Sequence, residues 1–264
     1  MSYQGLSGFN EIFVGGTNNY IKYGHKFENF RDTVNNPMIY SFCINGGTID
    51  NESLNHAKTI NNKLYEKFIN QKKKGLTGYK GIEDKYEEFD DHDSKHILIL
   101  TILFNNNINF KNIVEIGGGY GNCVRIANNI IEYNKWKIVD LPYMIELQHY
   151  FLKNEIDDIS KIEFIDGTNN NYEFKKNDID VVIATHSLSE LSWENFDNYM
   201  KNVVSKSKYL FLGYNKNCPS PFLINKKLNY IQENNYSKVN NFDYTEKHGA
   251  RVSYTLFKNN NLDN

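Results

Sequence analysis

A glycine-rich turn after an apolar run constrains the fold of this chain more than any other feature. The β-branched run at 113–116 leads into Gly117, Gly119 and Gly121, which stand at alternate positions. Glycine tolerates positive φ and lets the backbone approach a ligand closely. Apolar residues then recur at helical spacing over 122–133. The segment therefore predicts a strand, a tight turn and a helix whose first amides favour polar or anionic groups. A turn that uses glycine for its geometry alone is the alternative.

Short β-branched runs alternate with helical patterns through the rest of the chain. Further strands are expected at 136–139, 162–165, 178–185 and 208–212, and helices at 143–154, from Ser192 to about 205, and from Pro221 onward. Two last strands, at 236–244 and 251–258, are joined through His248-Gly249, a step typical of a hairpin turn. This order predicts an α/β fold with an open, Rossmann-like parallel sheet and an antiparallel edge.

The N-terminal third carries no recognisable catalytic motif. Helices are expected near 52–72 and 94–106, the second capped by Ser94. We therefore predict a helical cap or lid region over residues 1–93 and a ligand-binding domain over 94–264. The acidic and aromatic stretch at 79–93 is either a lid that closes over bound ligands or a solvated loop of a covering layer.

Composition narrows the function classes. The 30 basic and 32 acidic residues give a net charge of −2, which argues against a nucleic-acid partner. The apolar run at 96–104 is too short to cross a bilayer, and the first 20 residues lack the pattern of a signal peptide. Three cysteines without CxxC spacing indicate free thiols in a reducing compartment. The chain is rich in Asn, Lys, Ile and Tyr, whose codons are AT-rich, which indicates an AT-rich bacterial or viral genome. We expect a cytoplasmic protein, located in the host cytoplasm or virus factory if the genome is viral.

Open α/β sheets bind ligands beyond the carboxyl ends of their strands. Sites are therefore expected just after residues 116, 139, 165, 184 and 212. Asp140 ends the second predicted strand, and its carboxylate can accept both hydroxyls of a ribose. A helix-capping aspartate before Pro142 is the alternative. The glycine spacing is GxGxG, whereas dinucleotide-binding turns use GxGxxG.

The run VEIGGGYG at 114–121, with Asp140 downstream, resembles the signature of class I S-adenosylmethionine-dependent methyltransferases. Together with Asp140-Leu141-Pro142 and the HSLSE run at 186–190, it resembles more narrowly the sugar O-methyltransferase family. The resemblance covers roughly residues 85–258. It implies a seven-stranded sheet with an antiparallel C-terminal hairpin, S-adenosyl-L-methionine as cofactor, and a sugar or glycan precursor as the small-molecule substrate in glycan biosynthesis.

The same resemblance assigns the cofactor contacts to residues at the ends of the first four strands. The glycine turn would contact the methionine part and the ribose of the cofactor. Further residues would contact the methionine amino group, the ribose hydroxyls, the adenine and the reactive methyl group. The residues assigned in this way are Glu115, Gly117, Gly119, Gly121, Asp140, Leu141, Asp166, Gly167 and Thr185. For Asp166-Gly167 an ordinary Asp-Gly turn is the alternative.

Catalysis is assigned to the segment after the fourth strand. A sugar hydroxyl is a poor acid, so a base that removes its proton as the C–O bond forms would help the transfer. His186 has the appropriate pKa class, and Glu190, one helical turn later, could orient the imidazole or bind sugar hydroxyls. The alternative is that His186 only lines the cofactor pocket through its backbone.

Substrate contacts are assigned to Tyr214 and Asn215, expected after the fifth strand, and to His248 in the hairpin turn. Several carboxylates could hold a divalent metal, but they form no compact set, so metal use and the oligomeric state stay open: Asp91, Asp93, Asp166 and Glu190. A methyltransferase of another small molecule or of nucleic acid, and a non-catalytic cofactor-fold subunit, are the competing functions. The absence of an NPPY-type tetrad after the fourth strand argues against N-methylation of bases.

Overall fold

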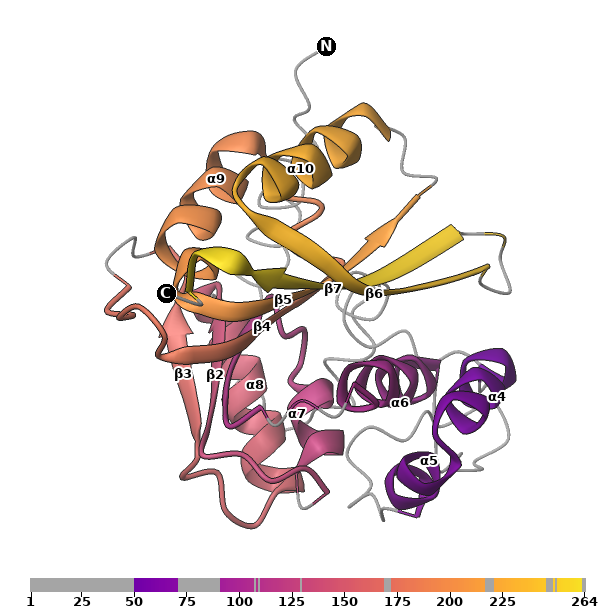
Figure 1. The fold of residues 1–264 in the computed structure, drawn as a ribbon. Helices are drawn as coiled ribbons and strands as arrows, with labels where there is room; N and C mark the ends of the chain where they lie inside the picture. Colours follow the sequence, from indigo (N-terminus) through magenta and orange to yellow (C-terminus); the bar gives the residue numbers. More distant parts are fainter. Residues whose placement is uncertain are drawn as a thin grey trace. The chain divides into compact units, whose positions relative to one another are not determined.

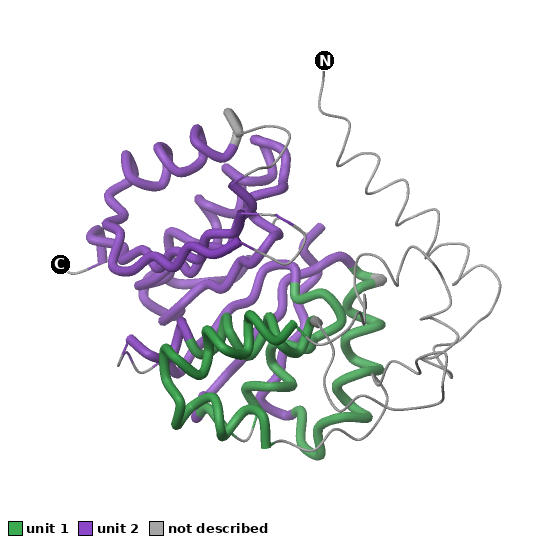
Figure 2. The backbone as a smooth tube through the Cα atoms, turned by 90° about the vertical axis from the view of Figure 1, so that its right-hand side faces the viewer, with its two compact units in different colours: residues 1–101, 118–131, 142–159 green, residues 102–117, 132–141, 160–264 purple. Residues whose placement is uncertain are grey.

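A computed structural model describes most of the chain from residue 50 onward (Figure 1). The described residues are 50–70, 91–106, 108, 110–128, 130–168, 172–216, 221–245, 249 and 251–262. Among them, no helix has the length and apolar character needed to span a membrane. The chain divides into two compact units, drawn in green and purple in Figure 2. Unit 1 comprises residues 1–101, 118–131 and 142–159, and unit 2 comprises 102–117, 132–141 and 160–264.

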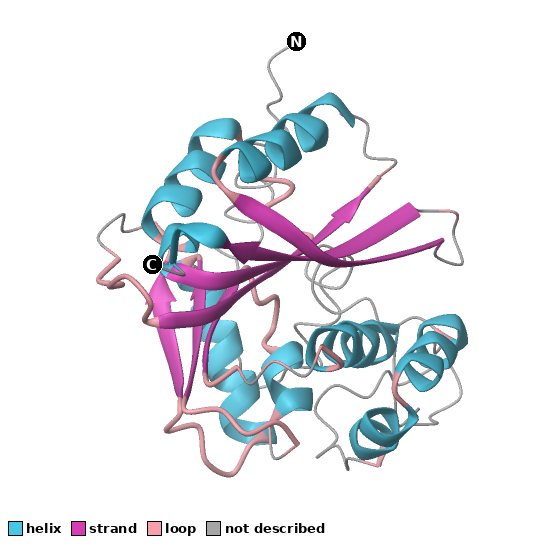
Figure 3. Ribbon diagram, viewed as in Figure 1, coloured by secondary structure: helices cyan, strands magenta, loops and turns pink. Residues whose placement is uncertain are grey.

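Unit 2 contains the whole β-sheet, shown in magenta in Figure 3. Its seven strands are ordered β3-β2-β1-β4-β5-β7-β6. Their bounds are β1 Asn112–Ile116, β2 Lys135–Asp140, β3 Ile162–Asp166, β4 Ile179–Thr185, β5 Ser207–Asn215, β6 Tyr236–Thr245 and β7 Arg251–Asn259. Strands β1 to β5 pair in parallel, and β7 runs antiparallel to both β5 and β6. The predicted Rossmann-like sheet and its C-terminal hairpin are confirmed.

The direction of winding reverses between β1 and β4. The chain proceeds outward from β1 through β2 to β3, and β4 then returns to the other side of β1, where Val114 pairs with Val182. In sheets of this kind, ligands bind outside the carboxyl ends of the strands at such a reversal. The topology thus marks the ends of β1 and β4 as the centre of a candidate site.

One face of the sheet packs on two helices of the same unit, α9 (Trp193–Asn202) and α10 (Pro221–Glu233), as Figure 1 shows. Side chains alternate between faces along a strand, so every second residue of the inner strands joins this core. The strand residues in it include Val114, Ile116, Val182, Ala184, Leu210 and Leu212, and the helix residues include Phe196, Met200, Ile224 and Ile231. Burying each such side chain stabilises the fold by about 1.5–3 kcal/mol.

The ends of α9 follow local signals in the sequence. The Ser192 hydroxyl accepts the amide of Asn195 at 3.3 Å, which confirms the predicted cap. The helix ends at Asn202, and a short 3₁₀ turn, η1 (Val204–Lys206), leads into β5. The prediction of one helix to about 205 therefore ran past its end. A second 3₁₀ turn, η2 (Asn260–Leu262), follows β7.

Unit 1 is helical. It contains α4 (Asn51–Ile60), α5 (Asn62–Ile69), most of α6 (Asp91–Phe104), α7 (Asn122–Ala127) and α8 (Pro142–Glu155). The single helical stretch predicted at 52–72 is two helices, because Asn61 adopts an extended conformation (φ −156°, ψ 90°) and its side chain accepts the Leu64 amide. An asparagine that caps a new helix thus ends the preceding one.

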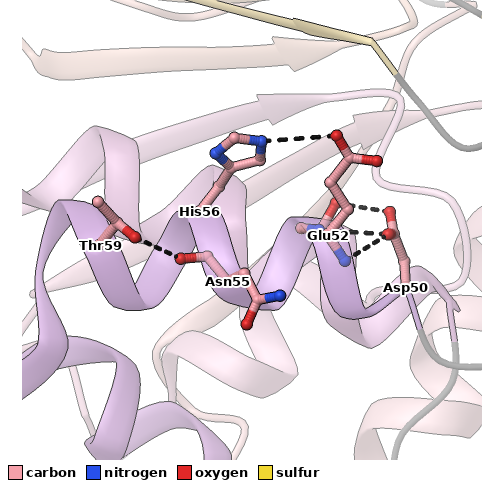
Figure 4. Close-up of polar contacts among 6 residues, drawn as sticks. Asp50, Glu52, Asn55, His56 and Thr59 are labelled. Carbon is pink, nitrogen blue, oxygen red and sulfur yellow. Dashed lines mark hydrogen bonds and ion pairs between the residues drawn. The ribbon is translucent and has the colours of Figure 1, made fainter.

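The start of α4 shows how a short polar residue begins a helix (Figure 4). The Asp50 Oδ1 atom accepts the amides of Glu52 and Ser53 at 3.1 and 3.2 Å, and its Oδ2 accepts the Ser53 hydroxyl. Further along, His56 lies 3.8 Å from Glu52, and the Thr59 hydroxyl donates to the carbonyl oxygen of Asn55. Asp50 therefore satisfies two of the amides that lack helical partners.

Two other predicted boundaries were wrong. Helix α6 begins at Asp91, so Ser94 lies buried inside it and does not cap it. Helix α7 ends at Ala127 and not at residue 133, because Asn128 is extended and a turn follows, in which Ile131 donates to Ala127. The apolar spacing beyond 127 belongs to half-buried residues of that turn. The predicted boundary after residue 93 falls within α6, and the cap role of residues 1–93 stays a prediction.

Candidate active site

The register of the parallel strands brings the predicted site positions of unit 2 to one edge of the sheet. Ile116 pairs with Val139, Asp140 with Asp166, and Thr185 with Gly213. Because parallel strands end on the same side, the residues that follow them share this edge. The predicted ends of the first four strands lie within one residue of the observed ends, whereas β5 continues past residue 212 to Asn215. Strand pairing makes these ends neighbours.

Gly117 joins two of these strand ends. Its φ is +73°, and a Cβ atom added to it would lie 2.5 Å from the Cβ of Ser187. Its amide donates to Val139 at 3.0 Å, while the Ser187 hydroxyl donates to the carbonyl oxygen of Ile116. Only glycine fits here, both for its dihedral angle and because the segment after β4 passes directly over it. Ser187 was not singled out from the sequence.

The rest of the glycine turn lies in unit 1 and is also left-handed. Gly119 has φ +57° and Gly121 φ +97°. The Gly121 amide donates to Gly118, and the Gln148 side chain of α8 donates to the Gly119 carbonyl at 2.8 Å. A Cβ at Gly121 would press on Leu152 at 3.0 Å, whereas one at Gly119 would meet none of the described residues within 4 Å. The backbone at Gly119 is therefore held in shape without a described side chain covering it.

A buried polar network anchors α7, the helix that follows this turn. The Arg125 guanidinium lies 2.6 Å from the Asp93 carboxylate of α6, and its Nε donates to the Asn122 side chain at 2.7 Å. The Asn122 amide group donates to both Asp93 and His96 Nδ1, each at 3.1 Å. Desolvation lowers the pKa of His96 to about 3, so its imidazole accepts this bond in the neutral form. Asp93, considered above as a metal ligand, is thus occupied by Arg125.

Metal ligands do not gather elsewhere in the part of the chain that the structure describes. No group of three or more His, Cys, Asp or Glu side chains there is arranged to hold an ion. The side chain of Asp91 lies outside the described atoms, and Asp166 is engaged in a local turn.

Glu115 is a buried carboxyl group on β1. The Trp136 indole of β2 donates to its Oε2 at 2.9 Å. Burial raises the pKa of Glu115 to about 7, the negative charge of Asp140 raises it further, and the indole bond opposes both. Near neutral pH this group is balanced between its neutral and charged forms. Its predicted contact with a methionine amino group stays a prediction.

Asp140 ends β2 with a half-buried carboxylate. Its Oδ1 accepts the amide of Leu141 at 2.8 Å, and its carbonyl oxygen accepts the amide of Gly167 at 2.7 Å. The backbone after β2 is therefore tied to the backbone after β3. Leu141 is half-buried beside them. Local bonds hold the Asp140 backbone, while its carboxylate remains partly accessible.

Asp166 and Gly167 form the turn expected as the alternative to a cofactor contact. The Asp166 Oδ1 accepts both the amide and the hydroxyl of Thr168, at 2.8 and 2.6 Å. A Cβ at Gly167 would lie 2.7 Å from the Tyr199 hydroxyl, and the Tyr172 hydroxyl donates to the Gly167 carbonyl. The rings of Tyr172 and Tyr199 stack 5.8 Å apart. The sequence offered no signal for these two tyrosines.

His186 follows β4 in a conformation that is uncommon for a residue with a side chain. Its φ is +57°, and its amide donates to the Gly213 carbonyl at 3.0 Å. Its ring is half-buried and meets the Tyr254 ring edge-to-face, with Nε2 3.5 Å from the tyrosine hydroxyl oxygen. Left-handed residues of this kind cluster at functional sites. Thr185, directly before it, is also half-buried.

Glu190 does not stand one helical turn from His186, because residues 186–191 form turns and no helix. The Glu190 amide donates to the Ser187 carbonyl at 2.9 Å, and the side chain is exposed. The expected helical relation was wrong. The ring contact that orients the imidazole comes from Tyr254 of β7, far away in the sequence.

Tyr254 is buried in an aromatic stack that crosses three strands. Its ring lies 6.0 Å from those of Phe211 and Tyr244, at interplanar angles of 9° and 21°. A Cβ at Gly213 would lie 2.8 Å from the Tyr254 ring, so this glycine makes room for it. The sequence predicted a strand over 251–258 and offered no signal for the contact of Tyr254 with His186.

Comparison with solved structures identifies the architecture. The chain superposes on a candidate RNA methyltransferase of Pyrococcus horikoshii with a TM-score of 0.52 and 11% identity, covering 75% of this chain and 98% of the other. It superposes on the N-methyltransferase NodS of Bradyrhizobium japonicum, solved with S-adenosyl-L-homocysteine, with a TM-score of 0.51 and 12% identity, covering 76% and 98%. The chain therefore shares the Rossmann-like α/β fold of these two methyltransferases. No family model matches the chain, and no curated protein does.

Within this fold, the predicted substrate residues are placed as follows. Tyr214 and Asn215 are the last residues of β5 and do not follow it. Tyr214 is 6% exposed and packs in the core with α10, so its ring is not available to stack on a sugar. Asn215 is half-buried and pairs with Val252. His248 lies outside the described residues.

Proposed function

We propose that this protein is an S-adenosyl-L-methionine-dependent methyltransferase that methylates a hydroxyl oxygen of a sugar or glycan precursor. The observation that carries the proposal is the left-handed backbone of Gly117 at the end of β1, together with the carboxylate of Asp140 at the end of the adjacent strand. Gly119 and Gly121, which follow Gly117 in the chain, are left-handed as well. Bound S-adenosyl-L-homocysteine in a structure that shares the fold supports this choice of cofactor.

The residues fit such a cofactor chemically. A bare backbone at Gly119 lets a ligand approach, and the partly accessible carboxylate of Asp140 can accept the two ribose hydroxyls. We assign Leu141 to one side of the adenine and Asp166-Gly167 to its amino group, with Thr185 nearest the methyl. Glu115 and Gly121 support the methionine part in this proposal.

The chemistry needs alignment and a base. When bound, the cofactor would supply a methyl group on a sulfonium, so transfer to the acceptor oxygen would form a C–O bond, break the C–S bond and leave that electron pair on sulfur. His186 accepts the hydroxyl proton, which makes the oxygen more nucleophilic as the bond forms. The Tyr254 hydroxyl lies 3.5 Å from Nε2 of His186 and so holds the imidazole on that side. Much of the rate then comes from holding the two reacting atoms in line.

A sugar hydroxyl is the proposed acceptor because the runs at 114–121, 140–142 and 186–190 resemble the sugar O-methyltransferase family. The net charge of −2 agrees with an acceptor that is not a polyanion. Glu190, Asn215 and His248 are the polar residues that we assign to its hydroxyls. No step in this proposal requires a metal ion.

The cofactor is tested by calorimetric titration of S-adenosyl-L-methionine into the wild type and two aspartate variants. We expect Asp140→Ala to weaken binding at least about tenfold, because two charge-assisted hydrogen bonds are lost. Asp178→Ala is the matched control, since this exposed aspartate precedes β4 at the opposite edge of the sheet. A wild-type protein that binds no cofactor would refute the proposal.

The acceptor is tested by offering nucleotide sugars, simple phenols and a short RNA with methyl-labelled cofactor. Transfer to a sugar oxygen, reduced about 10²–10⁴-fold in His186→Ala, supports the full proposal. If only RNA or a phenol is methylated, the proposed substrate class is wrong, but the assignment as a methyltransferase stands. A His186→Ala variant with wild-type kcat would exclude this residue as the base.

A further inference from the structure

A lysine in the middle of α10 is almost completely buried. Lys227 is 1% exposed, and its Nζ lies 2.6 Å from the carbonyl oxygen of Leu191, 2.7 Å from that of Ser189 and 3.4 Å from that of Leu188. An ammonium group has three donors, so these carbonyls can take all of them. Lysine is almost never fully buried unless it is paired in this way.

The three carbonyls belong to one segment, residues 186–191, which we call the β4 loop. Two other anchors hold this loop: the Ser187 hydroxyl donates to Ile116 of β1, and the Ser189 hydroxyl donates to Gly213 of β5 at 3.3 Å. Lys227 adds the anchor from the helix side, and it is the only charged donor among the hydrogen bonds named here. The β4 loop is therefore clamped to two strands and a helix.

The clamp has a consequence for His186, the first residue of the β4 loop. Its backbone is left-handed, with φ +57°. A non-glycine residue keeps such a conformation only where its surroundings impose it. Within the loop there is one turn bond, from the Glu190 amide to the Ser187 carbonyl. The bonds that hold the loop to the rest of the unit come from the strands and from Lys227.

We propose that Lys227 is a positioning residue for methyl transfer: its buried ammonium holds the β4 loop so that the His186 imidazole stays against Tyr254. The proposal rests on the function proposed above. Lys227 touches neither cofactor nor acceptor in this assignment, so its effect passes through His186. A lysine that only stabilised the fold would change the unfolding free energy and leave the geometry of His186 unchanged in the folded protein.

The test compares Lys227→Met with Lys226→Met. Lys226 is the adjacent residue, but it is exposed and lies 3.8 Å over the ring of Trp193. For Lys227→Met we expect kcat to fall about 10- to 100-fold, because misplacing a catalytic group slows transfer, while KM for the cofactor stays within about twofold. Amide exchange of residues 187–191 should accelerate. Lys226→Met should match the wild type in all three measurements.

Two further variants keep the proposal testable if Lys227→Met does not fold. Lys227→Arg keeps several donors and Lys227→Gln keeps one amide group, so kcat should fall in the order Lys, Arg, Gln. Equal kcat in the folded variants would overturn the proposal. The His186 imidazole signals, followed by NMR, separate this outcome from a failure of the methyltransferase assignment. If no acceptor is methylated by the wild type, unchanged His186 signals and loop exchange in Lys227→Gln would still overturn the role of Lys227.

Discussion

At the scale of single residues, the glycines of one turn are required for different physical reasons. Gly117 has no room for a side chain because Ser187 passes over it, whereas at Gly119 a Cβ would lie more than 4 Å from every residue that the structure describes. Both are left-handed, which costs a residue with a side chain about 1–2 kcal/mol. A mutation at Gly117 should therefore report mainly on packing, and one at Gly119 mainly on the approach of a ligand.

We expect Gly119→Ala to lower the unfolding free energy by only about 1–2 kcal/mol, the cost of the left-handed backbone, and to weaken cofactor binding at least tenfold. Gly117→Ala should destabilise the protein more, because a clash with Ser187 is added. Urea unfolding and calorimetry measure the two effects. Wild-type cofactor affinity in Gly119→Ala would contradict the assignment of this turn.

Glu115 predicts a pH dependence of stability. Its pKa is raised from 4.5 to about 7 in the folded protein, so the folded state binds a proton that the unfolded state has released between these values. The wild type should therefore lose up to roughly 3 kcal/mol of stability from this group as the pH rises from 4.5 to 7, with no further loss above. Glu115→Gln still accepts the Trp136 bond and should remove that loss.

Urea unfolding at pH 5 and pH 8 checks this expectation. The stability of the variant relative to the wild type should be higher at pH 8 than at pH 5, since only the wild type must bury a charge at pH 8. A constant difference between the two proteins would show that the Glu115 pKa is not raised.

At the scale of elements, helices and strands are positioned by contacts that no local pattern encodes. Arg125 in α7 and Asp93 in α6 form a buried ion pair 32 residues apart. Tyr254 in β7 reaches His186 after β4, 68 residues away. The sequence identified the helices and strands around these residues, but the partners became visible only when the elements were packed.

We expect Arg125→Met to destabilise the protein by about 3–5 kcal/mol, because it leaves the Asp93 carboxylate buried without its cation. Lys201→Met is the control: it breaks an exposed pair with Asp197 on α9 and should cost about 1 kcal/mol or less. Chemical denaturation measures both. Adding Asp93→Asn to Arg125→Met should recover part of the loss, and no recovery would argue that the charge is not the cause.

At the scale of the whole molecule, acidic and basic residues nearly cancel, with a net charge of −2. Neutralisation of phosphates by lysine and arginine supplies most nonspecific affinity for nucleic acids, at about 10⁻⁴–10⁻⁶ M in physiological salt. We expect this protein to bind a single-stranded RNA or DNA 20-mer more weakly than that range. Fluorescence anisotropy at 150 mM salt measures it, and tight binding that falls steeply with salt would contradict the proposed acceptor class.

The sequence by itself determined where the strands lie along the chain, the C-terminal hairpin and the glycine turn, because period-two alternation and glycine geometry are local properties. It determined the position of Asp140 at a strand end for the same reason. Only the tertiary structure decided that Asn61 divides a helix, that Tyr214 is buried, and that Tyr254 and Lys227 converge on the segment containing His186. The break at Asn61 is a local cap, in which its side chain accepts the Leu64 amide. The other contacts join residues distant in the chain, and they arise when packing brings separate elements within bonding distance.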